Sequence, residues 1–496
     1  MKYISTRDTS IGFSSAQAMK QGLSKEGGLF VPETVVPFEK DEISALSGRP
    51  YRDAAFAVLK KYLTDFTDEE LWDCIDSAYS EKRWAASEIT PLVPLSDSAY
   101  ILELFHGPTC AFKDVALQIL PKFLTYSIKK TGEDKTVVIL VATSGDTGKA
   151  ALEGFADVEG TRIAVFYPDD GVSDMQKLQM VTQSGANVNV GAVIGNFDDA
   201  QNGVKKIFTD KEFAKRIAAR GFMLSSANSI NWGRLLPQIV YYVYAYARLL
   251  AMGRVKAGEK INICVPTGNF GNILASYYAM KMGVPVNRLI CASNENNVLT
   301  DFIKTGVYDK NRTFYTTISP SMDILISSNL ERLLFDLSDG DEKLVTSYMK
   351  SLSEKGRYEV TDEIKSRISK LFESGFTDDD GTKETIRRVF EEKGYLCDTH
   401  TGVAVTVYND YVKRTGDTTP TVIASTASPY KFAKSVLEAL KADIAGKDDF
   451  ELLNMLNEKS GVPVPDALGL LKTKPVRFSE KIKKEDMEAF VDDYLK

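Results

Sequence analysis

The stretch from His106 to Gln118 contains the residue best suited to covalent chemistry, Lys113. A Gly-Pro pair interrupts the backbone ahead of it, and the residues after Thr109 are predicted to form a helix that begins near Lys113. Its apolar neighbours are Phe112, Val115 and Ala116. An amine in apolar surroundings loses hydration of its charged form, so its pKa falls and the neutral amine becomes a nucleophile. We therefore predict a Schiff base between Lys113 and a carbonyl cofactor, although a solvated helix lysine would explain this segment alone.

The sequence Thr-Ser-Gly-Asp-Thr-Gly at 143–148 follows a predicted strand and opens a predicted helix. Two glycines permit a tight turn, and a helix N-terminus favours an anion. The Gly-Lys pair at its end is similar to a P-loop, but that motif would require Gly at 143 and Ser or Thr at 150, where Thr143 and Ala150 stand. Since the hydroxyl that would hold magnesium is missing, a P-loop NTPase is disfavoured. An ordinary strand-to-helix turn remains the simpler alternative.

A second glycine loop, Pro-Thr-Gly-Asn-Phe-Gly-Asn-Ile, occupies 266–273. Gly268 and Gly271 free the backbone to surround an anion with N–H groups, and Asn269 and Asn272 add side-chain donors. The loop contains no lysine and no acidic metal ligand. We therefore predict that it holds a cofactor phosphate without a metal ion.

A third loop, Asn-Ser-Ile-Asn-Trp-Gly-Arg at 228–234, precedes a long apolar helix. Arg234 is a planar donor that suits a phosphate or a carboxylate. Asn228 and Ser229 suit an N-terminal helix cap, and capping alone would explain Ser229. The loop is therefore a candidate binding site for an anionic substrate.

Ser425 and Thr426 end a fourth apolar strand. Side chains alternate along a strand, so the two hydroxyls are predicted to face opposite ways and only one can address a ligand on a given side. A hydroxyl there can bond a ring nitrogen without forcing that nitrogen to stay protonated.

Regular strand and helix units position these residues from about residue 100 onward. Apolar strands that alternate with helices predict doubly wound, mostly parallel sheets covered on both faces. Ligands of such sheets bind outside the carboxyl ends of the strands, where all four loops lie. The predicted strands are 136–142, 162–167, 187–193, 222–225, 260–265, 289–292 and 421–429, and the predicted helices are 149–156, 175–183, 198–208, 235–252, 273–282, 298–306 and 431–440.

The overall composition is that of an ordinary globular protein, with 496 residues, 44% hydrophobic and 26% charged. A net charge of -7 argues against nucleic-acid and anionic-membrane partners. The five cysteines lack C-x-x-C spacing, which disfavours a disulfide framework and a zinc site. The N-terminus lacks the apolar core of a signal peptide, so we expect a cytoplasmic protein. Pro237 and Arg248 interrupt the 235–252 segment, which indicates a buried helix and not a membrane span.

The composition changes along the chain predict five parts. They are an N-terminal α/β domain at 1–95, a core of regular strand and helix units at 96–310, a charged helical insertion at 311–394 in which the strand pattern fades, a return to the core at 395–440, and a charged helical tail at 441–496 without identifiable chemistry.

In combination, the motifs resemble one family. The order of His-Gly-Pro-Thr-x-Ala-Phe-Lys-Asp, Ser-Gly-Asp-Thr-Gly and Gly-Asn-Phe-Gly-Asn is similar to that of the threonine synthases in the pyridoxal-phosphate-dependent fold type II group. Residues 2–7 and 26–32 are similar to the family's N-terminal domain. The resemblance implies that residues 96–310 are a catalytic core of two α/β lobes. It also implies the cofactor pyridoxal 5'-phosphate, no metal, and conversion of the small molecule O-phospho-L-homoserine with water into L-threonine and phosphate. It leaves a monomer and a homodimer equally open.

The resemblance also assigns roles to individual residues. Lys113 matches the catalytic Schiff-base lysine, and Thr426 matches the threonine at the pyridine nitrogen. The remaining expected cofactor contacts are Asp146, Gly268, Asn269, Phe270, Gly271 and Asn272. The expected substrate contacts are Ser144 and Thr147 at the carboxylate, and Asn228, Ser229 and Arg234 at the phosphate.

Two positions depart from the family pattern. Ser428 stands where many relatives have a histidine, and Cys110 replaces an aliphatic residue, which suits packing because a buried cysteine behaves as a small apolar residue. The only histidines, His106 and His400, are interpreted as structural.

Other functions remain open at this point. A serine or threonine dehydratase, or an amino-acid phospholyase, would share the cofactor and the lysine. The motif at 228–234 favours a phosphorylated substrate, because a dehydratase that acts on a plain hydroxyl does not need it. A non-catalytic binding protein with the same fold is disfavoured by the presence of Lys113.

Overall fold

The computed structural model describes residues 1–143, 145–169 and 172–496. Two mostly parallel sheets form two lobes, as predicted. The five-stranded sheet has the order β16-β8-β7-β6-β9 and is parallel throughout. Its strands are β6 (Thr136–Ala142), β7 (Thr161–Pro168), β8 (Val188–Ile194), β9 (Phe222–Ser225) and β16 (Lys481–Lys483).

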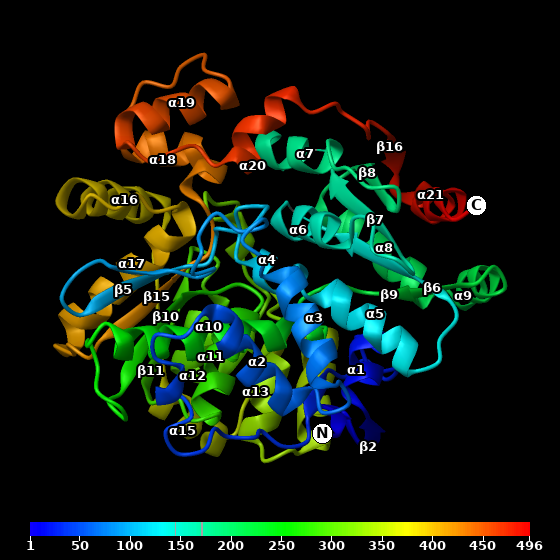
Figure 1. Cartoon of the computed structure of the whole chain (residues 1–496), viewed down its shortest axis with the longest axis horizontal. Helices are drawn as coiled ribbons and strands as arrows, with labels where there is room; N and C mark the ends of the chain where they lie inside the picture. The colour runs from blue at the N-terminus through cyan, green and yellow to red at the C-terminus, as the bar shows by residue number, and fades with distance from the viewer. Residues whose placement is uncertain (144, 170–171) are drawn as a thin grey trace.

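The six-stranded sheet has the order β14-β11-β10-β15-β5-β4, and only its edge strand β4 is antiparallel to its neighbour. Its strands are β4 (Leu92–Pro94), β5 (Ala99–Glu103), β10 (Ile261–Pro266), β11 (Val286–Ser293), β14 (Phe372–Phe376) and β15 (Thr421–Ser425). In Figure 1 this sheet lies at the lower left and the five-stranded sheet at the upper right. The central strand β10 is buried along its full length, and β6 is buried except at its two end residues, because helices cover both faces of each sheet.

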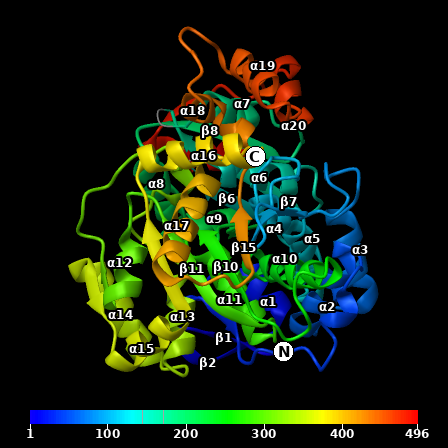
Figure 2. The ribbon, with the colours of Figure 1, turned by 90° about the vertical axis from the view of Figure 1, so that its left-hand side faces the viewer.

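Helices of the first lobe contact the five-stranded sheet, and helices of the second contact the six-stranded sheet. The first set comprises α6 (Asp146–Phe155), α8 (Phe197–Thr209) and α9 (Lys211–Ala218), with α7 (Asp174–Val181) packed on α6. The second comprises α11 (Gly271–Lys281), α12 (Val298–Thr305) and α17 (Thr399–Thr415), with α10 (Trp232–Ala251) packed on α11. Figure 2 shows β10, β11 and β15 side by side in the second lobe. The short helix α4 (Lys113–Leu117) contacts both α6 and α10, and α5 (Leu120–Lys130) follows it.

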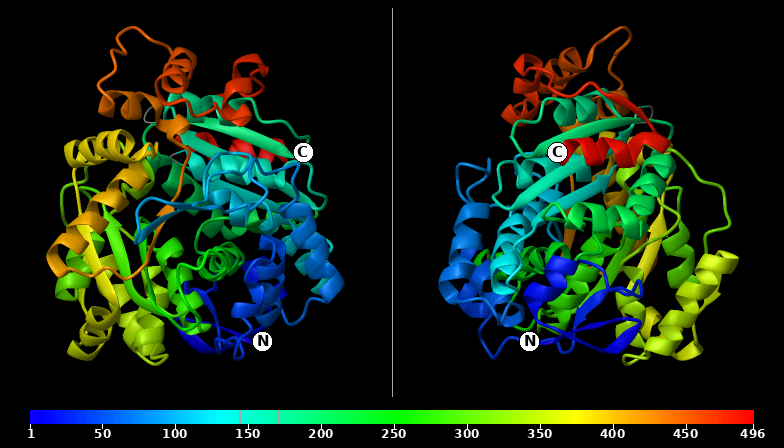
Figure 3. Two further views of the ribbon diagram at one scale, coloured as in Figure 1. Left: turned by 60° about the vertical axis from the view of Figure 1, so that its left-hand side comes forward. Right: turned by 90° about the vertical axis from the view of Figure 1, so that its right-hand side faces the viewer.

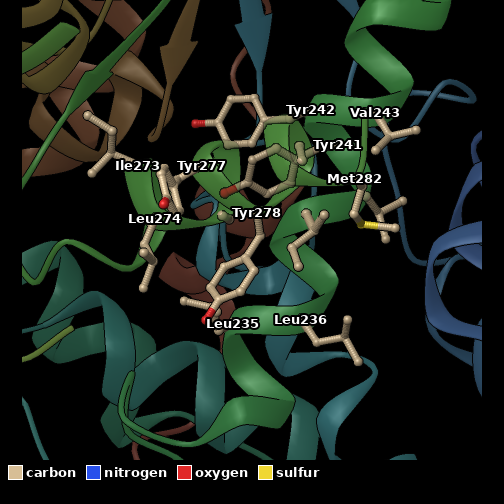
Figure 4. Close-up of a cluster of buried hydrophobic side chains, with 14 of the residues drawn as sticks. Leu235, Leu236, Tyr241, Tyr242, Val243, Ile273, Leu274, Tyr277, Tyr278 and Met282 are labelled. Atoms are coloured by element: carbon tan, nitrogen blue, oxygen red, sulfur yellow. The ribbon is translucent and has the colours of Figure 1, made fainter. Parts of the chain in front are cut away.

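The N-terminal segment packs on the second lobe. It contains a three-stranded antiparallel sheet of β1 (Tyr3–Ser5), β2 (Asp8–Phe13) and β3 (Phe30–Pro32), with α1 (Ser15–Gln21), η1 (Ser44–Leu46), α2 (Tyr51–Tyr62) and α3 (Asp68–Ala78). Its apolar side chains share one core with α10 and α11. Figure 4 shows part of this core, with Leu235 and Tyr241 of α10 beside Leu274 and Tyr278 of α11. The 235–252 segment is therefore a buried core helix, as predicted, and none of the described helices is long and apolar enough to span a membrane.

The segment at 311–394 is not purely helical, which corrects the sequence-based expectation. It contains η2 (Pro320–Met322), α13 (Leu330–Leu337), α14 (Glu342–Lys355), α15 (Asp362–Leu371) and α16 (Asp379–Lys393), but also β13 (Arg357–Glu359), which pairs with β12 (Val307–Asp309), and the edge strand β14. The sequence Phe-Glu-Ser-Gly-Phe of β14 has little strand pattern of its own, and pairing with β11 fixes its conformation.

The C-terminal tail also contributes a strand that the sequence pattern did not predict. It contains α19 (Asp449–Ser460), α20 (Asp466–Gly469), η4 (Leu470–Thr473), β16, η5 (Lys484–Asp486) and α21 (Met487–Tyr494), and it follows η3 (Pro429–Phe432) and α18 (Ala433–Ala439). β16 pairs with β8, so the last residues of the chain complete the first lobe. Figure 3 shows α21 on this lobe and the N-terminal strands at the other end of the molecule.

Candidate active site

Lys113 is the first residue of α4 and is buried between the two lobes. The turn before it is held by Asp114, whose carboxylate accepts hydrogen bonds from the backbone N–H and the hydroxyl of Thr109 at 2.8 and 2.7 Å. Burial raises the pKa of Asp114 to about 6. A Cβ on Gly107 would lie 2.5 Å from the Cβ of Asp114, so only glycine fits the turn. The predicted helix start at Lys113 is confirmed.

Among the described residues, the amine of Lys113 has two polar partners. Its Nζ lies 3.3 Å from Oδ2 of Asp146 and donates a hydrogen bond of 3.2 Å to the hydroxyl of Ser321. Burial lowers the pKa of Lys113; Asp146 opposes this shift, and the positive charges of Lys431 and Arg234 reinforce it. The structure thus places the amine in the environment that favours its neutral, nucleophilic form.

Asp146 occupies the centre of the site, in the first turn of α6. Its Oδ1 lies 2.6 Å from Nζ of Lys431 and accepts a hydrogen bond of 2.8 Å from the amide of Gln176. Although burial opposes ionisation, Lys431 and Lys113 hold the pKa of Asp146 far below its usual range. Thr147 follows it in the same turn and is half-buried. The predicted site residue Ser144 lies outside the described residues.

The glycine loop at 268–272 leads into the N-terminus of α11, which has no side-chain cap among the described residues. A Cβ on Gly268 would lie 2.6 Å from the carbonyl oxygen of Ser321. Phe270 adopts a left-handed backbone conformation, with φ of 63°, and starts the helix. Free N–H groups at a helix start are a ready site for an anion.

Asn272 connects this loop to α10. Its Oδ1 accepts hydrogen bonds from the hydroxyls of Tyr241 and Tyr242 at 2.7 and 2.5 Å. Its amide nitrogen Nδ2 is buried without a partner among the residues that the structure describes. Figure 4 shows both tyrosine rings beside α11. A buried donor without a partner fits a ligand with acceptor oxygens at this point.

Thr426 lies beside the lysine loop. Its carbonyl accepts a hydrogen bond of 2.8 Å from the backbone N–H of Phe112. The hydroxyl of Ser425 instead pairs with that of Thr401 in α17 at 2.8 Å. The predicted strand 421–429 ends at Ser425, because the following residues pair with the lysine loop and then turn.

The loop at 228–234 is arranged differently from the expectation in one respect. Asn231, and not Asn228 or Ser229, caps α10, through a hydrogen bond from the backbone N–H of Gly233 at 2.9 Å. Asn228 and Ser229 are thus half-buried residues of the preceding turn. The cap falls later because the helix begins at Trp232 and a cap must precede its first turn.

Arg234 is buried inside the first turn of α10. Its Nη1 donates a hydrogen bond of 2.9 Å to the carbonyl of Ala227, while its Nε has no partner in the described part of the chain. No acidic residue pairs with it among the described residues, and burial lowers its pKa to about 10. A buried guanidinium without a counter-ion is costly unless an anionic ligand neutralises it.

Four site residues were not identified from the sequence. Ser321 comes from the segment expected to be a helical insertion, and Gln176 from a helix without a motif. Lys431 lies in the turn after Thr426. Its closeness in sequence to that predicted site residue was the only feature that could have indicated a role in the site. His400, interpreted as structural, is hydrogen-bonded to Asp398 but also accepts a bond from Ser321. His106 is paired with Glu103, in agreement with its structural interpretation.

Lys149 belongs to the Gly-Lys pair that is similar to a P-loop, but it is not part of the site. Its amine is buried against Glu153, at 2.9 Å, and Gln183. No group of histidine, cysteine and acidic side chains that could hold a metal ion occurs in residues 1–143, 145–169 and 172–496. The site therefore consists of the buried amines of Lys113 and Lys431, the buried carboxylate of Asp146, the buried guanidinium of Arg234, and the start of α11, which has no side-chain cap among the described residues.

Three family models match this chain. "Threonine synthase N terminus" matches residues 2–79, "Pyridoxal-phosphate dependent enzyme" matches 83–426, and "Threonine synthase, C-terminal" matches 401–491. Human threonine synthase-like 1 is 39% identical over 90% of this chain, which spans only 61% of that relative's length. The threonine synthase of Pseudomonas aeruginosa is 40% identical over 88% of this chain and 90% of its own.

Solved structures agree with this result. The pyridoxal-phosphate-bound threonine synthase from Brucella melitensis has a TM-score of 0.88 at 34% identity, and both chains are covered completely. Threonine synthase from yeast has a TM-score of 0.89 at 35% identity, over 100% of this chain and 98% of its own.

Proposed function

Because this chain belongs to the threonine synthase family of pyridoxal-phosphate-dependent enzymes, we propose that it converts O-phospho-L-homoserine and water into L-threonine and phosphate. The observation that carries the proposal is Arg234, a buried guanidinium without an acidic partner among the described residues, which acts electrostatically on the buried amine of Lys113. A site with a reactive amine and an unneutralised cation suits an amino acid that carries a phosphate group.

The described residues fit the cofactor. Lys113 would bind its aldehyde carbon, and the uncapped start of α11 with the unpaired amide of Asn272 would hold its phosphate without metal. The hydroxyl of Thr426 would face the pyridine nitrogen, since Ser425 is engaged with α17. Pyridoxal phosphate, when bound, stabilises the negative charge that develops next to the amino-bearing carbon.

Residues of this chain carry out the proton transfers and bind the substrate. The neutral amine of Lys113 removes and returns protons at Cα and its neighbouring carbons, and burial favours this neutral form because it lowers the pKa of Lys113. The hydroxyl of Ser321, at 3.2 Å, and the carboxylate of Asp146 orient that amine. We propose that Thr147 and Ser144 bind the substrate carboxylate.

Arg234, Asn228 and Ser229 are proposed to bind the substrate phosphate. Two parallel N–H groups of a guanidinium can hold a phosphate and stabilise it as it leaves. Asn228 and Ser229 are available for this role because Asn231 caps the helix. The departing phosphate can then accept a proton from the water that adds at Cβ.

An amino-acid phospholyase remains the second candidate, because Arg234 would serve it equally well. Its products would be phosphate, ammonia and 2-oxobutanoate instead of threonine. Purified protein should be incubated with O-phosphohomoserine while phosphate, threonine and 2-oxobutanoate are followed together. Equal amounts of phosphate and threonine support the synthase; phosphate with 2-oxobutanoate supports the phospholyase, and no phosphate release contradicts both.

A second experiment tests the lysine. Borohydride reduction of the protein with bound cofactor, followed by peptide mapping, should place the cofactor mass on Lys113, and a label on another lysine would contradict the assignment. We further propose a cytoplasmic location, which the five free, buried cysteines support. The substrate is a small molecule, and no nucleic-acid or membrane partner is proposed.

A further inference from the structure

A second buried lysine, Lys431, shares the carboxylate of Asp146 with Lys113. Its Nζ lies 2.6 Å from Oδ1 of Asp146, and its side chain is 0% exposed. The Nζ of Lys113 lies 3.3 Å from the other oxygen. One carboxylate therefore lies between two amines in a buried row.

Lys431 is held in this position by groups that do not involve Lys113. Its Nζ donates a hydrogen bond of 3.0 Å to the carbonyl of Thr109. Its backbone N–H donates to the carbonyl of Ser428 at 3.1 Å, and the hydroxyl of Ser428 caps the turn η3 by accepting from the backbone N–H of Tyr430. The serine that departs from the family pattern thus caps the turn that directs Lys431 into the site.

The two lysines have different tasks. The amine of Lys113 must leave Asp146 when it reacts with a carbonyl group, whereas Lys431 is anchored on both sides. We infer that Lys431 is a positioning residue, the permanent counter-ion of Asp146, which lets Lys113 lose its proton and move without leaving a buried carboxylate unpaired. This inference rests on the proposed function only in taking Lys113 as the reacting amine.

The other charged groups around the row do not replace Lys431. Arg234 faces Lys113 and, like Lys431, disfavours a proton on its amine. Asp114 and Cys110 face Lys431; burial raises the pKa of Asp114 to about 6 and that of Cys110 to about 12.

Lys149 interacts only weakly with Lys113, Asp146 and Lys431, because the charge of Lys149 is paired with that of Glu153. Without Lys431, the carboxylate of Asp146 and the protonated amine of Lys113 would remain as an ion pair with no net charge. Such a pair holds its proton more tightly, so the pKa of Lys113 should rise.

The test measures how fast the full-length protein, freed of cofactor, recaptures pyridoxal phosphate on Lys113 as a function of pH. Only the neutral amine reacts, so the midpoint of this profile reports the titration of Lys113. In Lys431→Met and Lys431→Gln the midpoint should rise by about one pH unit, which slows capture about tenfold at a fixed lower pH. Lys431→Arg should keep the wild-type midpoint, and Asp146→Asn should shift it downward.

The controls separate charge from structure. Gln can still donate a hydrogen bond to Thr109, so this variant keeps the contact while it loses the charge, and it decides the question if the Met variant fails to fold. Unchanged midpoints in the folded neutral variants would overturn the inference, even with lower melting temperatures. A wild-type protein that captures the cofactor but makes no threonine would contradict the proposed function, while a shifted midpoint would still support the role of Lys431.

Discussion

The Nε2 atom of His400 accepts a hydrogen bond of 3.2 Å from the backbone N–H of Ser321, whose hydroxyl contacts the amine of Lys113. The other ring nitrogen, Nδ1, lies 2.7 Å from Oδ2 of Asp398, which fixes the orientation of the ring. His400 thus positions the turn η2, from which Ser321 reaches both Lys113 and Asp146. A buried histidine that looks purely structural in sequence is connected to the reacting amine through one residue.

We predict that His400→Leu lowers kcat about tenfold. The substitution leaves the buried N–H of Ser321 without an acceptor, which costs about 1–3 kcal/mol and displaces the turn. His400→Gln, whose side-chain oxygen can accept the same bond, should recover most of kcat. Steady-state kinetics and melting temperatures of both variants test this. Equal losses of kcat in the two variants would show that the hydrogen bond does not position Ser321.

The two glycines of the cofactor loop should respond differently to alanine. The nearest atom to a Cβ on Gly271 would be the amide nitrogen of Asn329, at an ordinary contact distance of 3.4 Å, whereas a Cβ on Gly268 would lie 2.6 Å from the carbonyl oxygen of Ser321. We expect Gly271→Ala to keep the melting temperature of the cofactor-free protein but to lose pyridoxal phosphate on dialysis. Gly268→Ala should lower both the melting temperature of the cofactor-free protein and the retention of pyridoxal phosphate.

Cofactor retention by Gly271→Ala equal to that of the wild type would contradict the phosphate assignment. Dialysis against a chelator provides the matched control for metal. Cofactor binding should not change when magnesium is removed, because the loop contains no acidic ligand.

Thr426→Val should reduce turnover more than Ser425→Ala. The hydroxyl of Ser425 is bound to Thr401, so its loss should cost about 1 kcal/mol of stability and little activity. The hydroxyl of Thr426 is proposed to face the pyridine nitrogen, so its loss should lower kcat. Unfolding curves and kcat for both variants give the ranking, and the reverse order would reject this register of the strand end.

Arg234→Lys should lower kcat/KM for O-phosphohomoserine about 10- to 100-fold, because a charge-assisted hydrogen bond contributes about 1.5–3 kcal/mol and lysine cannot bind phosphate through two parallel N–H groups. Arg234→Ala should be at least as damaging. Kinetics of both variants, beside the wild type, measure the effect. Unchanged kinetics with a lower melting temperature would remove Arg234 from the site and favour a dehydratase.

Inorganic phosphate offers a test of Arg234 that does not depend on turnover. Burial of its guanidinium without a carboxylate partner among the described residues should make the folded protein sensitive to anions. Phosphate should raise the melting temperature of the wild type and have a smaller effect on Arg234→Met, and equal effects on both would contradict the prediction.

Much of the fold and part of the candidate site could be predicted from the sequence. The apolar run Thr136–Ala142 has the length of a strand and is followed by a glycine-containing turn, so the sequence sets both this strand and the loop after it locally. Parallel pairing then brings the ends of such strands to one edge. This topology, together with the resemblance to the threonine synthases, is the reason why Lys113, Asp146, Arg234 and Thr426 were predicted to share one site.

The first residue of a helix was less predictable, because it depends on which side chain caps the helix. The helix α10 begins at Trp232 because Asn231, which also bonds to the carbonyls of Met19 and Ser226, is the residue that caps it. The edge strands β14 and β16 have weak patterns, and their partners β11 and β8 determine their conformation.

Only the tertiary structure decided which groups surround the amine of Lys113. Ser321, Lys431 and His400 come from parts of the chain far from Lys113 in sequence, and none belongs to a motif with it. Their side chains interact because the two lobes and the turns η2 and η3 close around Asp146. The amino-acid sequence alone thus determined that Lys113 and Asp146 can do the chemistry, whereas burial and charge pairing, which depend on packing between distant segments, decided the direction in which the pKa values of this amine and this carboxylate shift.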